Sequence, residues 1–395
     1  MSFFKEAQKL FLQNIRDYGM YIAFVVIIVI FSITTKGLFV SSRNIGNLVN
    51  ATSYIAVLAV GMTLVIVIHH IDLSVGFLAG FLGAIAAISM KFWLLPVYVT
   101  IPLVLVLGTL AGLITAFLVA QMNIPAFVAT LAGSLAYRGA LQLATASTGT
   151  IIISDKIFNA IANGYIPDIP ASWGILPGIH KVTLLLGLLA IILFIRGEIN
   201  ERRKTQAYHF EVLSMNMFIF KLVFVSAVIS AITWVLAGYQ GLSWAAVVLL
   251  IVVMIYSFIM SRSVLGRHIY AVGGNPEAAE LSGISVKNIT YLVFGSMGLL
   301  AALSGILYAS WLRSATTIAG TLFELDAIAA AFVGGVAVAG GVGKVTGSIV
   351  GALVMASLTN GMNLMGIDIS SQYIVRALVL AVAVIFDVTT RKVAK

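Results

Sequence analysis

Long apolar runs recur along almost the whole chain, and they constrain its fold more than any other feature. Twelve runs lie near residues 19–38, 46–68, 73–90, 94–120, 124–145, 181–196, 217–237, 243–260, 288–312, 326–343, 346–365 and 371–389. A helix needs about 20 apolar residues to cross a bilayer core of roughly 30 Å. Only 9% of the 395 residues are charged, against about 25% in a soluble domain. The sequence therefore predicts an all-α fold, a polytopic membrane bundle with about ten to twelve crossings, in which short glycine-rich runs form half-helices.

The distribution of basic residues predicts how this bundle is oriented. Lys and Arg number 23 against 14 Asp and Glu, giving a net charge of +9. They gather near the amino terminus, in 196–204, in 262–287 and at the carboxyl end. Cytoplasmic loops carry such an excess, so we expect all four clusters in the cytoplasm, with both termini inside and an even number of crossings. The charge indicates contact with anionic lipid headgroups and not with nucleic acid.

Three segments are expected outside the bilayer of what we take to be one membrane domain spanning 1–395. Residues 1–18 are amphipathic and of mixed charge, and we expect them in the cytoplasm. The polar stretch 146–180, with three prolines, predicts an external loop that carries a short surface helix. The stretch 261–288 predicts a cytoplasmic loop.

The cytoplasmic loop contains the strongest local signal. Asn275 and Pro276 suit the cap and first turn of a helix, and Glu277 favours its positive end. Ser282 and Gly283 end it, since glycine readily adopts the left-handed cap conformation. With Ala278 and Ala279 between them, these residues predict a helix of about two turns, marginal alone in water. Two interpretations stand: a surface knob that docks into another protein, or an ordinary loop helix.

Polar residues within apolar surroundings are candidates for lining a solute path, because a charge at the bilayer centre costs about 2.5–3.5 kcal/mol. The candidates are Asp72, Ser74, Glu324, Asp326, Asn360 and Asn363, and Arg376 poses the same choice. The structural alternative is capping, since acids favour the amino ends of helices. The two roles are compatible.

No catalytic or cofactor-binding set can be assembled from the sequence, so we expect a non-enzyme without cofactors. Cysteine is absent. His69 and His70 are adjacent, and neighbouring helical side chains point about 100° apart, which disfavours a shared metal ion. Residues 340–346 look like a phosphate loop, but Val345 stands where Ser or Thr must follow the lysine. ATP must therefore act through a partner.

Glycines concentrate in 76–83 and 334–351 of a chain with 36 of them. Small residues allow close helix packing in membranes. Ser74–Gly80 and Thr346–Gly351 also resemble each other, which fits either an internal duplication, common in transporters, or chance.

Motifs spread over roughly residues 40–390 resemble those of a known family. They are Ala59–Met62 with Ile71–Gly76, Ile124–Gly133, Gly266–Gly283, Glu324–Ala330, Ala339–Gly343 and Asn360–Gly361. The chain is similar to permease subunits of bacterial ABC importers for ribose, xylose and galactose. Residues 127–139 and Gln372–Val375 place it nearest the xylose-type permeases. His69 and His70 depart from the small or acidic residues usual there.

This resemblance implies a multi-pass protein of the bacterial inner membrane that moves a monosaccharide inward by alternating access. It implies three partners: ABC ATPase subunits, an extracytoplasmic sugar-binding protein, and a second permease chain, expected to be a copy of this one. Asn275 to Gly283 would then be the coupling helix. A stand-alone proton-coupled symporter is the main alternative, with Asp72, Glu324 or Asp326 as proton carrier. A membrane scaffold would leave the buried polar residues unexplained.

Overall fold

The computed structural model describes residues 15–170, 177–210 and 212–393, and these are mostly helical. The expected segment 1–18 lies largely outside the described residues. From the amino end the elements are α2 (Ile15–Thr34), α3 (Ser42–Val67), α4 (Val75–Lys91), α5 (Val97–Ala120), α6 (Ala126–Thr145), β1 (Thr150–Ile152), α7 (Lys156–Asn163) and α8 (Lys181–Ala207). They continue as α9 (Met215–Ala237), α10 (Trp244–Arg262), α11 (Val264–Gly274), α12 (Pro276–Leu281), α13 (Val286–Leu312), β2 (Ser314–Thr316), α14 (Phe323–Val333), α15 (Val345–Leu364) and α16 (Ile369–Val393).

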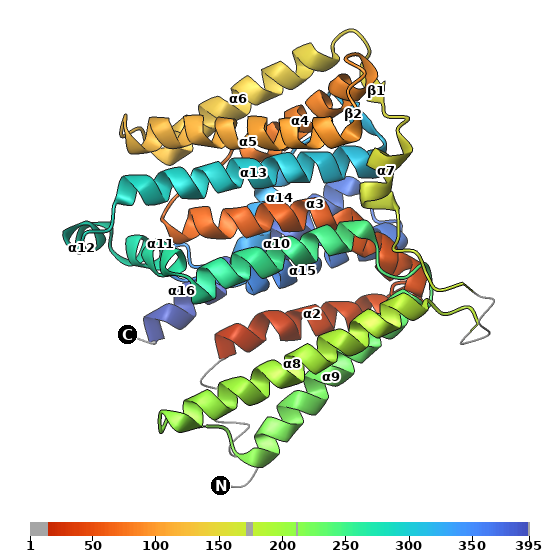
Figure 1. Cartoon of the computed structure of the whole chain (residues 1–395), viewed down its shortest axis with the longest axis vertical. Coiled ribbons are helices and arrows are strands. Elements are labelled where there is room, and N and C mark those ends of the chain that lie inside the picture. The colour runs from red at the N-terminus through yellow and green to blue at the C-terminus, as the bar shows by residue number, and fades with distance from the viewer. Residues whose placement is uncertain (1–14, 171–176, 211, 394–395) are drawn as a thin grey trace.

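The described helices confirm a polytopic membrane bundle. Seven of them, α3, α5, α8, α9, α10, α13 and α15, are long and apolar enough to cross a bilayer. Shorter apolar stretches lie in α2, α4 and α16. The start of α2 and the end of α16 lie at the same end of the bundle as α12 (Figure 1), an arrangement that an even number of crossings produces.

One expected crossing is helical over only part of its length. The run 326–343 was expected to form a single crossing, but α14 ends at Val333 after 11 residues. At 1.5 Å per residue such a helix reaches only about 16 Å. Gly335 and Gly340 adopt left-handed backbone angles (φ +85° and +66°) in the turn that follows, where the Gly341 amide donates to the Val67 carbonyl (2.8 Å) at the end of α3. The segment from β2 to this turn therefore still runs from one end of the bundle to the other, with α14 as its helical part.

The centre of the bundle is built from α3 and α13, which are the most buried of the long helices. Helix α13 packs against α3, α4 and α5, and glycines allow the closest of these approaches. A Cβ added at Gly298 of α13 would lie 2.1 Å from the carbonyl oxygen of Gly108 in α5. Such packing replaces the hydrophobic drive that lipid does not supply.

The two glycine-rich segments pack against opposite ends of α14. Gly76 and Gly80 of α4 touch the backbone of Ala319 and Gly320, just before α14 begins. Gly347 and Gly351 of α15 touch the end of α14 at Gly334 and Ala330. The short helix is therefore held between α4 and α15, and both sets of glycines have a packing role.

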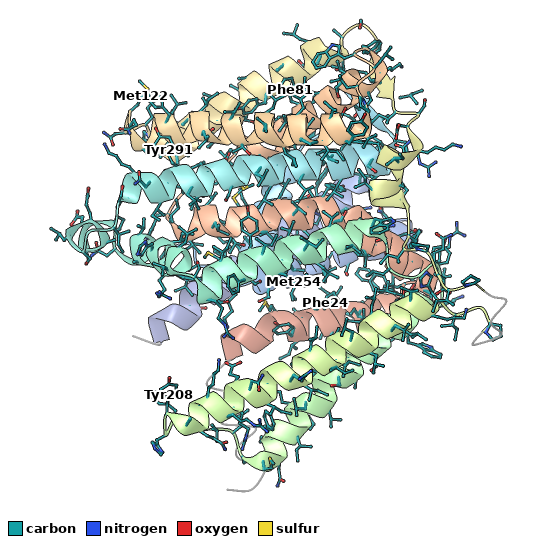
Figure 2. The ribbon with its side chains drawn as sticks, viewed as in Figure 1. Phe24, Phe81, Met122, Tyr208, Met254 and Tyr291 are labelled. Atoms are coloured by element: carbon teal, nitrogen blue, oxygen red, sulfur yellow. The ribbon has the colours of Figure 1, made fainter. Side chains whose placement is uncertain are left out.

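The hairpin of α8 and α9 stands at the edge of the bundle (Figure 1). Almost none of the residues in its apolar windows are buried, and side chains project outward along both helices (Figure 2). Tyr208, labelled at the free end of α8, is exposed. Since an apolar surface of this length is unstable in water, the hairpin is built to face lipid.

The bundle end opposite α12 is covered by the segment predicted as an external loop (Figure 1). Strand β1 pairs antiparallel with β2, with Ile151 opposite Ala315. The expected short helix is present as α7, where Ser310 of α13 accepts a hydrogen bond from the Ala162 amide (2.9 Å) and donates one to the Phe158 carbonyl (2.7 Å). Residues 171–176 of this loop lie outside the described residues.

Candidate functional site

The short helix predicted from Asn275 to Gly283 is present as α12. The Asn275 side chain accepts a hydrogen bond from the Ala278 amide (3.0 Å), and Pro276 occupies the first turn. Gly283 has φ +84°, the left-handed angle that favours glycine at a helix end. Both ends of the helix are therefore set locally, and the predicted caps are confirmed.

Helix α12 presents most of its surface to the outside of the bundle. Asn275, Pro276, Glu277, Ala278 and Ser282 are exposed, whereas Ala279 is buried and anchors the helix. Leu281 is 92% exposed, an unusual position for a large apolar side chain. The sequence analysis did not single out Leu281. Its position, as an apolar residue between Glu277 and Gly283 in an otherwise polar or small-residue helix, could have indicated an exposed apolar contact.

Helix α11 was not expected, and it joins α12 to the core of the bundle. Gly273 lies directly on the last turn of α3, so a Cβ there would be 1.9 Å from the Val67 carbonyl oxygen. The His69 Nε2 donates to the Gly273 carbonyl (2.6 Å). The Tyr270 hydroxyl donates to the Gly343 carbonyl (2.5 Å), and the Gly341 amide donates to Val67 (2.8 Å). We call this set of contacts the α11 joint.

Asp72 lies in the break between α3 and α4 and is only 3% exposed. Its Oδ1 accepts hydrogen bonds from the Ser74 amide (2.9 Å) and hydroxyl (2.6 Å). The break passes α6, whose Thr130 hydroxyl donates to the Ile71 carbonyl (3.3 Å). Asp72 therefore organises the turn before α4 through Ser74, but it does not cap the helix, whose N-cap is Ser74 without a side-chain cap hydrogen bond.

The acids of α14 lie beside this break. The Glu324 carboxylate rests against Gly76 of α4, and its Oε2 is buried without a hydrogen-bond partner in the described part of the chain. Asp326, two residues further, forms an ion pair with Arg376 of α16. The fold thus brings together the segments 72–76 and 324–326, which the sequence separates by about 250 positions.

The two asparagines of α15 link helices to one another. The Asn360 and Asn44 side chains exchange two hydrogen bonds (2.8 and 3.1 Å), which tie α15 to α3. Asn363 accepts a hydrogen bond from the Gln372 side chain of α16 (2.7 Å). Both amides therefore stabilise helix contacts.

The two histidines face different partners. His69 bonds to α11, whereas the ring of His70 lies 5.8 Å from that of Phe294. Within the described ranges no three His, Cys, Asp or Glu side chains are grouped as metal ligands. In the segment 340–346, backbone groups of Gly341 and Gly343 bond to Val67 and Tyr270 in the α11 joint.

Apolar helices that break at buried polar turns, with a capped helix held outside the bundle, define a multi-pass membrane transport protein. The profile of a family described as "Branched-chain amino acid transport system / permease component" matches residues 44–384. The chain belongs to this permease family.

Its curated relatives match along nearly their full length. The xylose transport system permease protein XylH of Haemophilus influenzae is 38% identical over 379 residues, covering 96% of this chain and 98% of the relative. XylH of Escherichia coli K12 is 36% identical, covering 96% and 93%. The ribose import permease protein RbsC of Haemophilus influenzae is 34% identical, covering 93% and 91%. No solved structure matches significantly.

Proposed function

We propose that this chain is the membrane-spanning permease subunit of an ATP-driven importer that carries a monosaccharide into a bacterial cell. The observation that carries the proposal is α12, a doubly capped helix with an exposed apolar tip, in a chain 38% identical to a xylose transport system permease. Because the segment 340–346 departs from the phosphate-loop motif at Val345, ATP would act through a partner ATPase, and α12 is the surface through which that partner could move the permease.

The relatives favour a sugar as substrate. The family description names branched-chain amino acids, but a family profile groups permeases of different substrates. The curated relatives cover over nine-tenths of this chain and carry the names xylose and ribose. Full-length identity is the stronger guide, so a pentose such as xylose is the proposed cargo.

Helix α12 is the proposed coupling helix. It is too short to be stable in isolation, yet both of its ends are fixed and its exposed side chains are available to a partner. The α11 joint then links it to the end of α3 and to the turn before α15. A push on α12 by the ATPase would reach Val67 and Gly341 through direct hydrogen bonds and backbone packing.

The proposed path runs beside the broken helices. The turns at 68–74 and 317–322 meet at Gly76 and Glu324, and α14 is too short to cross. Irregular backbone at membrane depth is tolerated where it is buried in protein or lines a cavity. We assign Asp72, Ser74, Glu324 and Asp326 to the surroundings of the path, with Asn360 and Asn363 holding the helices that flank it.

The remaining partners and the orientation follow from this assignment. The α12 end of the bundle faces the cytoplasm with both termini, where the basic clusters lie, and the end with α7 faces outward. An extracytoplasmic sugar-binding protein delivers the cargo there, and a second copy of this chain completes the path. The apolar faces of α8 and α9 contact membrane lipid.

Uptake in proteoliposomes tests the proposal. The permease is reconstituted with the ATPase and binding protein of its own transport system, and labelled xylose is followed with ATP inside or with an imposed proton gradient. We expect uptake that requires ATP and both partners. Uptake by the permease alone, driven by the proton gradient, would replace the importer with the symporter.

A further inference from the structure

Four aromatic side chains from three helices meet near the outward end of the bundle. They are Tyr54 of α3, Tyr308 and Trp311 of α13, and Phe323 of α14. The ring centroids of Tyr54, Tyr308 and Phe323 lie 4.9 to 5.0 Å apart. The Trp311 ring lies 6.1 Å from Tyr54 and 6.3 Å from Tyr308. We call these four residues the aromatic cluster.

The aromatic cluster is only partly shielded. Trp311 is 37% exposed, and Tyr54 and Tyr308 are half-buried. Trp311 lies one residue before the end of α13, next to strand β2 and helix α7, which cover the end of the bundle opposite α12. The rings are therefore placed where cargo would enter from outside.

Charged groups border the rings on one side. Phe323 is followed directly by Glu324, whose Oε2 is buried without a hydrogen-bond partner among the residues that the structure describes. Arg376 pairs with Asp326 and is close enough to Tyr54 for electrostatic interaction. A buried carboxylate oxygen without a donor thus directly follows Phe323 in the chain, and a neutralised ion pair lies near Tyr54.

This combination fits one class of ligand better than others. A monosaccharide has an apolar C–H face, which packs on aromatic rings, and hydroxyls, which donate to carboxylates and accept from guanidinium groups. An amino acid carries two full charges, and its carboxylate would need a free cation, whereas Arg376 is already paired with Asp326. The surroundings thus favour a neutral polyhydroxylated ligand.

We propose that the aromatic cluster, with Glu324 and Arg376, is a monosaccharide subsite of the transport path. It takes the sugar released at the outward end, stacking it on Trp311 and Tyr308 and binding its hydroxyls at Glu324. The inference rests on the proposed importer function and deepens it by naming the residues that meet the sugar.

The test uses the complete reconstituted importer with Trp311→Ala and Tyr308→Ala. We expect each to lower xylose uptake about tenfold, because each removes one stacking face. ATP hydrolysis stimulated by the loaded binding protein should persist, since α12 and the docking surfaces are unchanged. Tyr308→Phe, which keeps the ring, should transport nearly as the parent does.

Phe224→Ala is the matched control. Phe224 is an exposed aromatic on α9, stacked on Phe220 with centroids 6.0 Å apart, and it is far from the cluster. We expect unchanged uptake. Parent-like uptake in both cluster variants, or an equal loss in the control, would overturn the subsite.

A direct binding measurement covers the case in which an alanine variant is unstable. The permease–ATPase complex, without binding protein, is titrated with xylose, ribose and leucine while tryptophan fluorescence is recorded. We expect a saturable change with the sugars, none with leucine, and its loss in Trp311→Phe. A sugar signal that survives in Trp311→Phe refutes the subsite. If the parent importer moves no monosaccharide with ATP, the proposed function itself fails.

Discussion

Replacing Gly273 by alanine should disconnect α12 from the transport core while leaving most of the protein unchanged. The Cβ of the new residue would lie 1.9 Å from the Val67 carbonyl oxygen, whereas ordinary contact begins at 3.4 Å. The α11 joint must therefore open by about 1.5 Å. The atoms nearest to this Cβ all belong to the backbone, so no flexible side chain can move to relieve the contact.

The expected energetic cost is that of an overpacked core, about 1–3 kcal/mol. The chain can reduce this cost by moving α11 away from α3, but this lengthens the His69–Gly273 hydrogen bond, now 2.6 Å. Either outcome weakens the joint through which α12 reaches the bundle. Helical content should remain, since the change is confined to one contact.

Gly274→Ala is the neighbouring control, because nothing lies within 4 Å of a Cβ at that position. Both variants are reconstituted with the partner ATPase and binding protein, and xylose uptake is measured per ATP hydrolysed. We expect the ratio to fall in Gly273→Ala and to stay near the parent value in Gly274→Ala. Equal ratios in the two variants would refute the role of the α11 joint.

Three further changes test other parts of the structure. Gly298→Ala should destabilise the detergent-purified protein by about 1–3 kcal/mol in denaturant unfolding, because its Cβ would lie 2.1 Å from a backbone oxygen. Gly139→Ala, with open space around it, should leave the stability unchanged. Equal effects of the two changes would contradict the close packing of α13 on α5. Arg376→Gln should lower the free energy of unfolding by about 1–3 kcal/mol, because it leaves Asp326 unpaired. Adding Asp326→Asn should recover part of this loss. If the effects of the two changes on stability simply add, the ion pair is not a stabilising contact. Leu281→Asp, at a 92% exposed position, should change stability by no more than about 0.5 kcal/mol yet reduce ATP-driven uptake, and full uptake would remove Leu281 from the docking surface.

Much of the fold could be predicted because bilayer thickness fixes how long an apolar helix must be. All twelve predicted runs correspond to helices, most with ends shifted by a few residues, although α14 fills only the first part of the run 326–343. Helix α8 continues beyond the run 181–196 to Ala207. The Glu, Arg and Lys residues that follow the apolar run are too polar for the bilayer core but have high helix propensity, so the helix extends past the membrane. Helix α11 was missed because its glycines and polar residues are typical of a loop.

The candidate site was predictable only where its interactions are local. The caps of α12 come from Asn275 and Gly283, a few residues from the helix they bound. The Asp326–Arg376 pair and the His69–Gly273 bond join residues about 50 and 204 positions apart. No spacing rule in the sequence predicts such contacts, which arise from how α14, α16 and α11 pack.

Capture of the partner ATPase from detergent tests most directly whether α12 is the coupling helix. The permease is tagged at its amino terminus and incubated with the ATPase of its transport system, in parallel with Glu277→Arg, Gly283→Val and the control Gly274→Ala. We expect the parent and the control to retain the ATPase, and the two α12 variants to lose it while remaining folded. Equal retention by all four proteins, or by none, would contradict the assignment of α12 as the surface through which ATP hydrolysis drives transport.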